Sequence, residues 1–379
     1  MKNKKIYLDY NATSPLLKEV EKEILRAIKN HQFLPLNPSS IHFYGREGKK
    51  LINQTKQKLK EFLKASNAEV IFTASATEAN NLALRGFRDN AGNRAKSVII
   101  SATEHSSVLK TAQIIAENLF VVRVDANGVI DLKHLKEILQ TAPKPVLISI
   151  IFANNEIGTI QPIKEIAQLS IEHNAYFHTD AVQMVGKKRV DFDDLNVDML
   201  SLSAHKFGAL QGIGALLIKK GIHLDAIITG GGQEKNYRSG TENMLGIFSL
   251  LKAVEALSNF SMPDTLRNYL ESEIAKKAPE TIIVAKNTTR LPNTTCLIMK
   301  GINSTETLLI NFDLKGIMVS SGSACSSGKI EPSHVLKALG YSDVQAKSAI
   351  RVSIGKYTTK KEIDQFVDAW VGEYSKILG

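Results

Sequence analysis

Lys206 stands directly after a short apolar segment, in Ser203-Ala204-His205-Lys206. The residues before it, 199–203, predict a β-strand, so the lysine lies at the carboxyl end of that strand. A lysine that is partly withdrawn from water can have a lowered pKa and form a Schiff base with a carbonyl compound. A single lysine after a strand is more often a solvated loop residue, so the interpretation depends on its neighbours.

Asp180 is the first such neighbour. It follows a predicted strand over 175–179 and precedes Lys206 by 26 residues, about one strand–helix–strand step, so both can reach one pocket. An aspartate at this point can equally be a helix N-cap. A carboxylate that keeps a pyridine nitrogen protonated, combined with a lysine Schiff base, is the arrangement that pyridoxal 5'-phosphate (PLP) chemistry requires. The pair therefore predicts PLP as the cofactor.

Polar residues follow other predicted strands as well. Thr77 begins a helical pattern after a turn of small residues, where backbone N–H groups can bind phosphate, although a Ser or Thr there is more often only a cap. Ser203 and His205 could add phosphate donors. His105 could lie flat on a cofactor ring, and Asn154-Asn155-Glu156 could bind a ring oxygen or the substrate. The repetition of the pattern favours one shared site over separate structural roles.

The two cysteines lie in contrasting contexts. Cys325 lies within residues 319–328, a Ser/Gly/Ala run that predicts an exposed, mobile loop with a nucleophilic thiol, or simply a tolerated surface cysteine. Cys296 alternates within an apolar segment, which predicts a core position. Arg351 lies in a predicted strand over 349–355, where it could face solvent or bind a substrate carboxylate with its guanidinium fork.

Length and composition limit the class of protein. The 379 residues, 43% hydrophobic and 23% charged, predict a folded, enzyme-sized chain and exclude a disordered one. Two cysteines 29 residues apart cannot alone build a disulfide framework or a thiol metal site, so no metal is expected. The net charge of +10 is scattered, with only 6% aromatic residues, so no nucleic-acid partner is expected. No apolar run suits a signal peptide or a membrane span, which predicts a cytoplasmic protein.

Short β-branched segments alternate with amphipathic ones, which predicts an α/β fold with a mostly parallel sheet. The seven expected strands cover 69–73, 97–101, 119–124, 146–152, 175–179, 199–203 and 214–218. The expected helices among them cover 77–85, 107–117, 132–140 and 163–173. The later part of the chain predicts helices at 247–257, 265–277 and 359–376 and strands at 281–284 and 294–300. We expect a large domain over 16–255 and a smaller α+β domain over 1–15 and 256–379.

Taken in order, these segments resemble the cysteine desulfurases of the NifS/IscS type, in the class V aminotransferase family of fold-type I PLP enzymes. The resemblance covers nearly the whole chain, and the segments that carry it lie at 7–13, 37–42, 76–78, 103–105, 154–158, 180–183, 203–206, 238–243, 321–325 and 351–353. It implies the fold of a fold-type I PLP-dependent transferase. Their number and order carry the resemblance, because no single segment is specific enough.

The resemblance also implies a role for each matching residue. Lys206 forms the Schiff base, Asp180 pairs with the pyridine nitrogen, and Gln183 holds the phenolic oxygen. His105 stacks on the ring and assists proton transfer, while Asn155 and Arg351 take the substrate carboxylate. The implied phosphate ligands are Ala76, Thr77, Ser203 and His205, joined by Thr241 from the other subunit of a homodimer with shared active sites.

The implied reaction converts L-cysteine to L-alanine and leaves the sulfur on Cys325 as a persulfide, for delivery to an acceptor protein such as an iron–sulfur scaffold. A class V aminotransferase or a selenocysteine lyase could use the same pocket, and a non-catalytic binding protein with this fold is a further alternative. The chain departs from the family's usual pattern in loops, at Leu36, Ser75, Ala209-Leu210-Gln211 and Lys235-Asn236-Tyr237. None of these departures falls on a proposed catalytic group.

Overall fold

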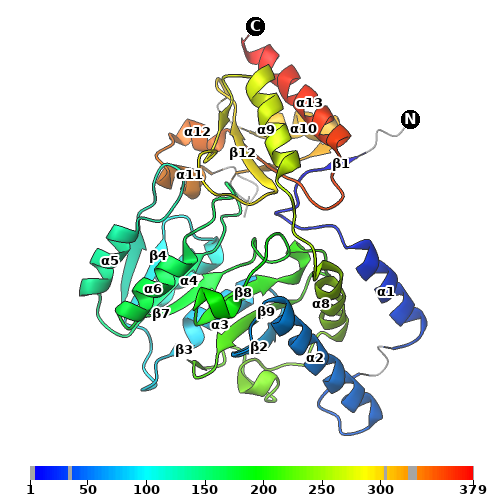
Figure 1. Ribbon diagram of the computed structural model, residues 1–379, viewed down its shortest axis with the longest axis vertical. Helices are drawn as coiled ribbons and strands as arrows, with labels where there is room; N and C mark the ends of the chain where they lie inside the picture. Colours follow the sequence, from blue (N-terminus) through cyan, green and yellow to red (C-terminus); the bar gives the residue numbers. More distant parts are fainter. Residues whose placement is uncertain (1–4, 33–35, 303–304, 323–330, 379) are drawn as a thin grey trace.

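Two sheets organise the molecule, which is described here from a computed structural model covering residues 5–32, 36–302, 305–322 and 331–378. The larger sheet has seven strands and lies in the lower part of Figure 1. The smaller one has four strands and lies in the upper part, beside helices α9 (Thr265–Lys277), α10 (Glu306–Leu314) and α13 (Lys360–Leu378) (Figure 1).

The seven-stranded sheet has the order β2-β9-β8-β7-β6-β4-β5. Its strands are β2 (Ala68–Thr73), β4 (Ser97–Ser101), β5 (Asn118–Val122), β6 (Val146–Ile151), β7 (Tyr176–Asp180), β8 (Met199–Ser203) and β9 (Gly214–Lys219). Neighbours from β5 to β8 run parallel, and only β9 runs antiparallel to both of its neighbours. All seven expected strands are therefore confirmed, each within two residues of its predicted bounds.

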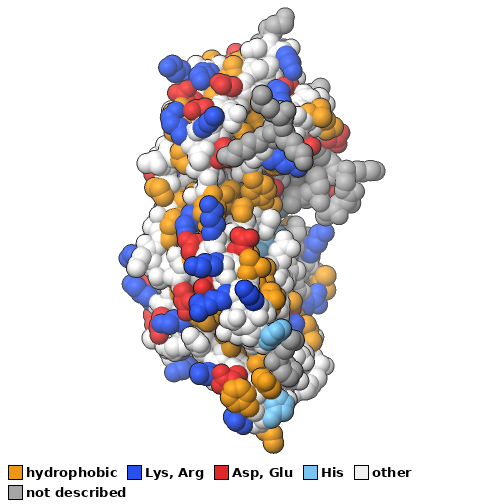
Figure 2. All heavy atoms as spheres, turned by 90° about the vertical axis from the view of Figure 1, so that its right-hand side faces the viewer, with side chains coloured by type: hydrophobic (Ala, Val, Ile, Leu, Met, Phe, Trp, Pro, Cys, Tyr) orange, Lys and Arg blue, Asp and Glu red, His pale blue; other side chains and the backbone are white. Residues whose placement is uncertain are grey.

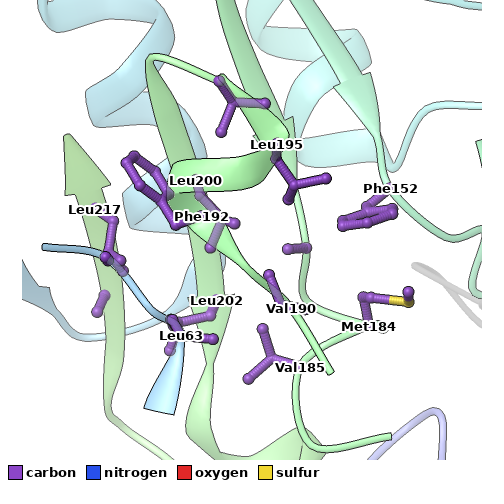
Figure 3. Close-up of a cluster of buried hydrophobic side chains, with 14 of the residues drawn as sticks. Leu63, Phe152, Met184, Val185, Val190, Phe192, Leu195, Leu200, Leu202 and Leu217 are labelled. Atoms are coloured by element: carbon purple, nitrogen blue, oxygen red, sulfur yellow. The ribbon is translucent and has the colours of Figure 1, made fainter. Parts of the chain in front are cut away.

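Both faces of this sheet are buried. On one face, Leu200 and Leu202 of β8 pack with Leu217 of β9 and with Phe192 and Leu195 of the segment that precedes β8 (Figure 3). The alternate residues of β8 and β9 point to the opposite face and join a second apolar cluster. Continuous apolar strands are what a parallel sheet covered on both sides requires, because neither face meets water.

Helices cover the sheet and connect its strands. Those expected from the sequence are α3 (Ala76–Gly86), α4 (Ser106–Ile115), α5 (Leu132–Thr141), α6 (Ile163–Glu172), α8 (Met244–Leu257), α9 (Thr265–Lys277) and α13 (Lys360–Leu378). The sequence reading missed α1 (Lys18–Lys29) and α2 (Phe43–Phe62), which pack against α8. The apolar signal of α2 is weak because much of its buried face consists of glycine and threonine. Short helices complete the set: α7 (Phe192–Leu195), α10 (Glu306–Leu314), α11 (His334–Ala338) and α12 (Asp343–Lys347).

The four-stranded sheet has the order β11-β12-β15-β14, formed by β11 (Ile282–Ile283), β12 (Thr294–Ile298), β15 (Ala349–Ser353) and β14 (Ser320–Ser321). The aromatic rings of Phe312, Phe366 and Trp370 contact one another in the apolar cluster beside this sheet, and those of Phe312 and Trp370 are stacked. The N-terminal strand β1 (Ile6–Tyr7) pairs with β13 (Ile317–Met318), and Asp9 bridges to Ser353. Residues 6–9 thus lie beside the smaller sheet. One further pair joins β3 (Phe87–Arg88) to β10 (His223–Leu224).

On the face shown in Figure 2, lysine and arginine side chains are interspersed with acidic ones rather than gathered into one patch. None of the described helices is both long enough and apolar enough to span a bilayer. Within the described ranges, no group of three or more His, Cys, Asp or Glu side chains could hold a metal ion.

Candidate active site

A cavity of about 410 Å³ lies where the carboxyl ends of the larger sheet's strands meet the smaller sheet. Most of the residues predicted from the sequence line it: Ala76, Thr77, His105, Asn155, Asp180, Gln183, Ser203, His205, Lys206 and Arg351. Thr241 is exposed and does not line this cavity, and Cys325 lies outside the described residues. The parallel topology explains the convergence, because it brings strand ends that are distant in sequence to one edge.

Lys206 ends a short 3-10 turn, Ala204–Lys206, that follows β8 directly. Its Nζ donates to the backbone oxygens of Asn11 and Ala12, each at 2.8 Å. Burial lowers the pKa of Lys206 to about 8, and the nearby Arg351 charge adds to this effect. A sizeable fraction of the amine is therefore neutral near pH 8, as nucleophilic attack on a carbonyl requires.

Asp180 is the last residue of β7 and is 3% exposed. Its Oδ2 accepts from Asn80 Nδ2 at 2.8 Å, and its Oδ1 accepts from the backbone N–H of Val182 at 3.0 Å. These neutral donors fix the orientation of the carboxylate, and none of the described lysine or arginine side chains forms an ion pair with it. Asn80 was not predicted, although it lies three residues after Thr77 on α3, on the same side of that helix.

His105 is the N-cap residue of α4, and its Nδ1 accepts from the backbone N–H of Ser107 at 3.1 Å. Because a backbone N–H only donates, the neutral ring carries its proton on Nε2. Surrounding protein atoms lower the pKa of His105 by desolvation, and Lys206 lowers it further while Asp180 opposes the shift. The site therefore presents a neutral imidazole.

The N-terminus of α3 forms one end of the cavity. Ser75 caps the helix by accepting from the N–H of Glu78 at 3.2 Å, so the departure from the usual family pattern at this position supplies a cap. Gly214 of β9 allows this approach, because a Cβ there would lie 2.7 Å from the carbonyl carbon of Ser75. The unpaired N–H groups of a first helical turn favour an anion such as phosphate.

His205 extends this end of the cavity and contacts Thr13 Oγ1 through Nδ1 at 3.0 Å. Burial lowers its pKa to about 4, and the Lys206 charge lowers it further. The ring is therefore neutral at pH 7 and can serve as a hydrogen-bond partner rather than as a charge. Ser203, which precedes it at the end of β8, is 2% exposed.

Arg351 enters the cavity from β15 of the smaller sheet and is 3% exposed. Its Nη2 donates to Asp9 Oδ1 at 2.7 Å, and its Nη1 donates to the backbone oxygen of Asn155 at 3.3 Å. The Nε atom is buried and has no partner among the described groups. An unsatisfied guanidinium donor beside the cavity suits a carboxylate ligand.

Asn11 is a site residue to which the sequence reading gave no role. It is 1% exposed, and its carbonyl oxygen accepts from both Lys206 Nζ and Gln183 Nε2. Its Nδ2 donates to the backbone oxygen of Asn155 at 3.0 Å and to Thr294 Oγ1 at 2.9 Å. One amide therefore ties the N-terminal segment to both sheets. Its place in the resembling segment 7–13 was the available signal.

Cys296 lies in β12, is fully buried and is free, as its alternating apolar context predicts. Burial raises its pKa to about 12, so it is not a nucleophile at neutral pH. The loop after Lys206 departs from the family pattern at Ala209 and Leu210. Ala209 is buried, and the backbone N–H of Leu210 donates to Ser249 Oγ; neither residue lines the cavity. That loop therefore leaves the candidate site unchanged.

The fold and the site together define an α/β enzyme with a reactive lysine at the strand ends. Residues 6–366 match the family described as aminotransferase class-V, and the chain belongs to that family, which depends on PLP.

Comparisons with full-length relatives narrow the class of enzyme to the cysteine desulfurases. The chain is 40% identical over 373 residues to a protein named cysteine desulfurase IscS from Dictyoglomus turgidum, covering 96% of this chain and 93% of that one. The solved structure of a NifS-like protein from Rickettsia africae superposes with a TM-score of 0.89 at 36% identity, covering 98% and 100% of the two chains. A structure described as SspA in complex with cysteine gives a TM-score of 0.80 at 31% identity, covering 94% and 100%.

Proposed function

We propose that this cysteine desulfurase uses PLP to convert L-cysteine to L-alanine and transfers the sulfur to Cys325. The observation that carries the proposal is the convergence of Lys206, Asp180 and the α3 N-terminus on one cavity with Arg351. The relatives named cysteine desulfurase and the structure described with cysteine support the choice of substrate.

The residues present fit PLP. Asp180 would face the pyridine nitrogen, and Gln183 would hold the phenolic oxygen. The backbone of Ala76 and Thr77, with Ser203 and His205, would take the phosphate. A volume of about 410 Å³ suits a cofactor of this size. When bound, PLP supplies an aldehyde for amine chemistry and a ring that withdraws electrons from the substrate Cα.

The substrate's carboxylate would bind the free Nε edge of Arg351, with Asn155 beside it. The neutral amine of Lys206 would then remove the proton from Cα, because its pKa of about 8 leaves it a competent base at physiological pH. His105 would hold its Nε2 proton toward the reacting atoms. Of these groups, Arg351 is buried, Lys206 and Asn155 are partly buried, and His105 is exposed.

Sulfur transfer would use the Cys325 thiolate. It attacks the sulfur atom of the substrate, so that an S–S bond forms while the Cβ–S bond breaks and its electron pair stays with the carbon fragment. That fragment takes up protons and leaves as L-alanine. The persulfide on Cys325 then passes its outer sulfur to an acceptor, such as an iron–sulfur scaffold protein, in the cytoplasm.

The enzyme would act as a homodimer, with Thr241 completing the phosphate site of the partner subunit. Thr241 is exposed and lies outside its own cavity. Arg238 Nε binds Glu78 Oε1 at 2.8 Å and so holds the segment before Thr241 beside the first turn of α3. Exposed apolar side chains also support an interface, at Leu25, Ile28, Ile41 and Phe43. The domain division proposed is 16–255 against 1–15 with 256–379.

The chain's two cysteines give a matched test of the reaction. Sulfide and alanine are measured after L-cysteine and a reducing thiol are added to the PLP-loaded wild type, Cys325→Ser and Cys296→Ala. We expect equal amounts of both products from the wild type and from Cys296→Ala, and loss of at least about 100-fold in Cys325→Ser. Equal sulfide release by Cys325→Ser would contradict the persulfide step. Turnover of an amino acid with a keto acid in that variant would instead indicate an aminotransferase.

A further inference from the structure

A second buried lysine lies behind the candidate site. Lys187 is 5% exposed and follows Gln183 by four residues, in the turns after β7. Its Nζ donates to Asn11 Oδ1 at 2.8 Å and, in a short contact, to Gln183 Oε1. Both acceptors are amide oxygens rather than carboxylates. Because burial of an amine without a carboxylate partner is unfavourable, its retention at this point calls for a role.

The contact specifies the orientation of the Gln183 amide. The backbone carbonyl of Asn11 only accepts, so the amide atom that faces it is Nε2, and the oxygen of the amide faces Lys187, which donates to it. The Nε2 atom is then directed to the other side, where one hydrogen goes to the Asn11 carbonyl at 3.1 Å. Gln183 lines the cavity, and its second Nε2 hydrogen remains available on that side. Without Lys187, the amide oxygen would lose its donor, and only the contact of Nε2 with the Asn11 carbonyl would hold the amide in this orientation.

We propose that Lys187 is a positioning residue that fixes the Gln183 amide with its N–H toward the cavity, so that it donates to the phenolic oxygen of the cofactor. The proposal rests on the proposed function, since it assigns an orientation to a residue of that site. An amide in the reverse orientation would present an oxygen to a phenolate oxygen, and two acceptors repel each other.

The amine of Lys187 can donate to the amide oxygens in either charge state, although only the ammonium form is unable to accept. Burial lowers its pKa well below the ordinary value, with Lys206 and Arg351 adding to the shift. A neutral amine still has two N–H groups, which match the two amide oxygens it contacts. The carboxylates of Asp9 and Asp180 lie near the neighbouring Lys206, and both raise the pKa of that lysine. None of them contacts the Lys187 amine directly.

The test compares Lys187→Met with Lys188→Met, which changes the adjacent, partly exposed lysine. Each protein is loaded with PLP, and its visible absorbance is titrated from pH 5 to pH 10. A donor to the phenolic oxygen favours the deprotonated form of the bound cofactor, so its loss should raise the titration midpoint of Lys187→Met by about 0.5 to 1 pH unit. PLP should also bind about tenfold more weakly by equilibrium dialysis. Lys188→Met should match the wild type in both measurements.

A double-mutant cycle separates positioning from a general structural role. In a Gln183→Ala background, Lys187→Met should change PLP affinity by less than about twofold, because the amide that it orients is gone. Additive losses, or a wild-type titration in Lys187→Met, would overturn the proposal. If Lys187→Met does not fold, Lys187→Gln keeps a neutral donor there and should give a smaller shift in the same direction. Failure of the wild type to bind PLP would instead contradict the proposed function.

Discussion

The two walls of the cavity hold their cations in opposite ways. On the wall formed by the larger sheet, Lys206 donates to two backbone carbonyls, and Asp180 accepts from an amide and a backbone N–H. On the wall formed by the smaller sheet, Arg351 pairs directly with the Asp9 carboxylate at 2.7 Å. Opposite charges are thus kept out of direct contact on the first wall and joined on the second.

This difference matches the two tasks. A lysine held by neutral oxygens loses solvation without gaining a counterion, so its pKa falls to about 8 and the amine can react. An arginine side chain is not deprotonated in proteins, so its carboxylate partner serves to orient the guanidinium fork for a ligand. The hydrogen-bond partners therefore distinguish the two cations: neutral oxygens make Lys206 reactive, and a carboxylate prepares Arg351 to bind a ligand.

Arg351→Met tests the wall formed by the smaller sheet and should give the largest change in kinetics. Removal of the guanidinium should raise the KM for L-cysteine by about 10- to 100-fold, because a charge-assisted bond to the substrate carboxylate is lost. PLP loading should persist, since Lys206 remains. Steady-state kinetics and the visible absorbance of the loaded protein measure the two effects.

Arg290 provides the control for this change. It is also a buried arginine, but both of its terminal nitrogens bind Glu271 at 2.8 Å, away from the cavity. Arg290→Lys should therefore lower stability without a change in KM. A KM within about twofold of the wild type in Arg351→Met would show that the carboxylate binds elsewhere.

Much of this arrangement was predictable from the sequence, and the reason is topological. Lys206, Asp180 and His105 each follow a strongly apolar strand, so their place at one sheet edge follows from the parallel order alone. Asn11, Asn80 and Lys187 were missed because their roles arise from contacts across the fold. Asn11, for example, donates to Thr294, which lies in the smaller sheet and is 283 residues away in the sequence.

Asp9→Asn tests whether the separation of charges sets the reactivity of Lys206. The Asp9 carboxylate raises the pKa of Lys206 and so opposes the effect of burial. Its neutralisation should lower that pKa below about 8, by about half a pH unit. The rate of PLP incorporation into cofactor-free protein rises as the amine loses its proton, so its pH midpoint should move to lower pH.

The comparison for this change is Asp368→Asn, whose carboxylate is 74% exposed on α13. Its midpoint should equal that of the wild type. A midpoint for Asp9→Asn that moves to higher pH would mean that the unpaired Arg351 moves away from Lys206, so that the loss of its charge outweighs the loss of the Asp9 charge. The proposed direct effect of Asp9 on Lys206 would then be wrong.

A substitution of Glu156 should give the smallest effect among these substitutions. Glu156 tests the wall formed by the smaller sheet, because its carboxyl lies near Arg351 but does not pair with it. Ser333 Oγ donates to Glu156 Oε2 at 2.5 Å, and burial raises the pKa of Glu156 to about 7. The folded protein therefore holds this proton more tightly than the unfolded chain. Stability from this group is present below about pH 4.5 and is lost as the pH rises to about 7.

Glu156→Gln should remove that loss while it keeps a partner for Ser333. The free energy of unfolding in urea should match the wild type near pH 4.5 and exceed it by on the order of 2 to 3 kcal/mol above pH 7. Other groups that titrate in this window are common to both proteins, so the difference curve isolates Glu156. Glu165→Gln, on the exposed side of α6, should give a flat difference. A flat curve for Glu156→Gln as well would mean that Glu156 is ionised in the folded protein and that the Arg351 charge reaches it despite the lack of contact.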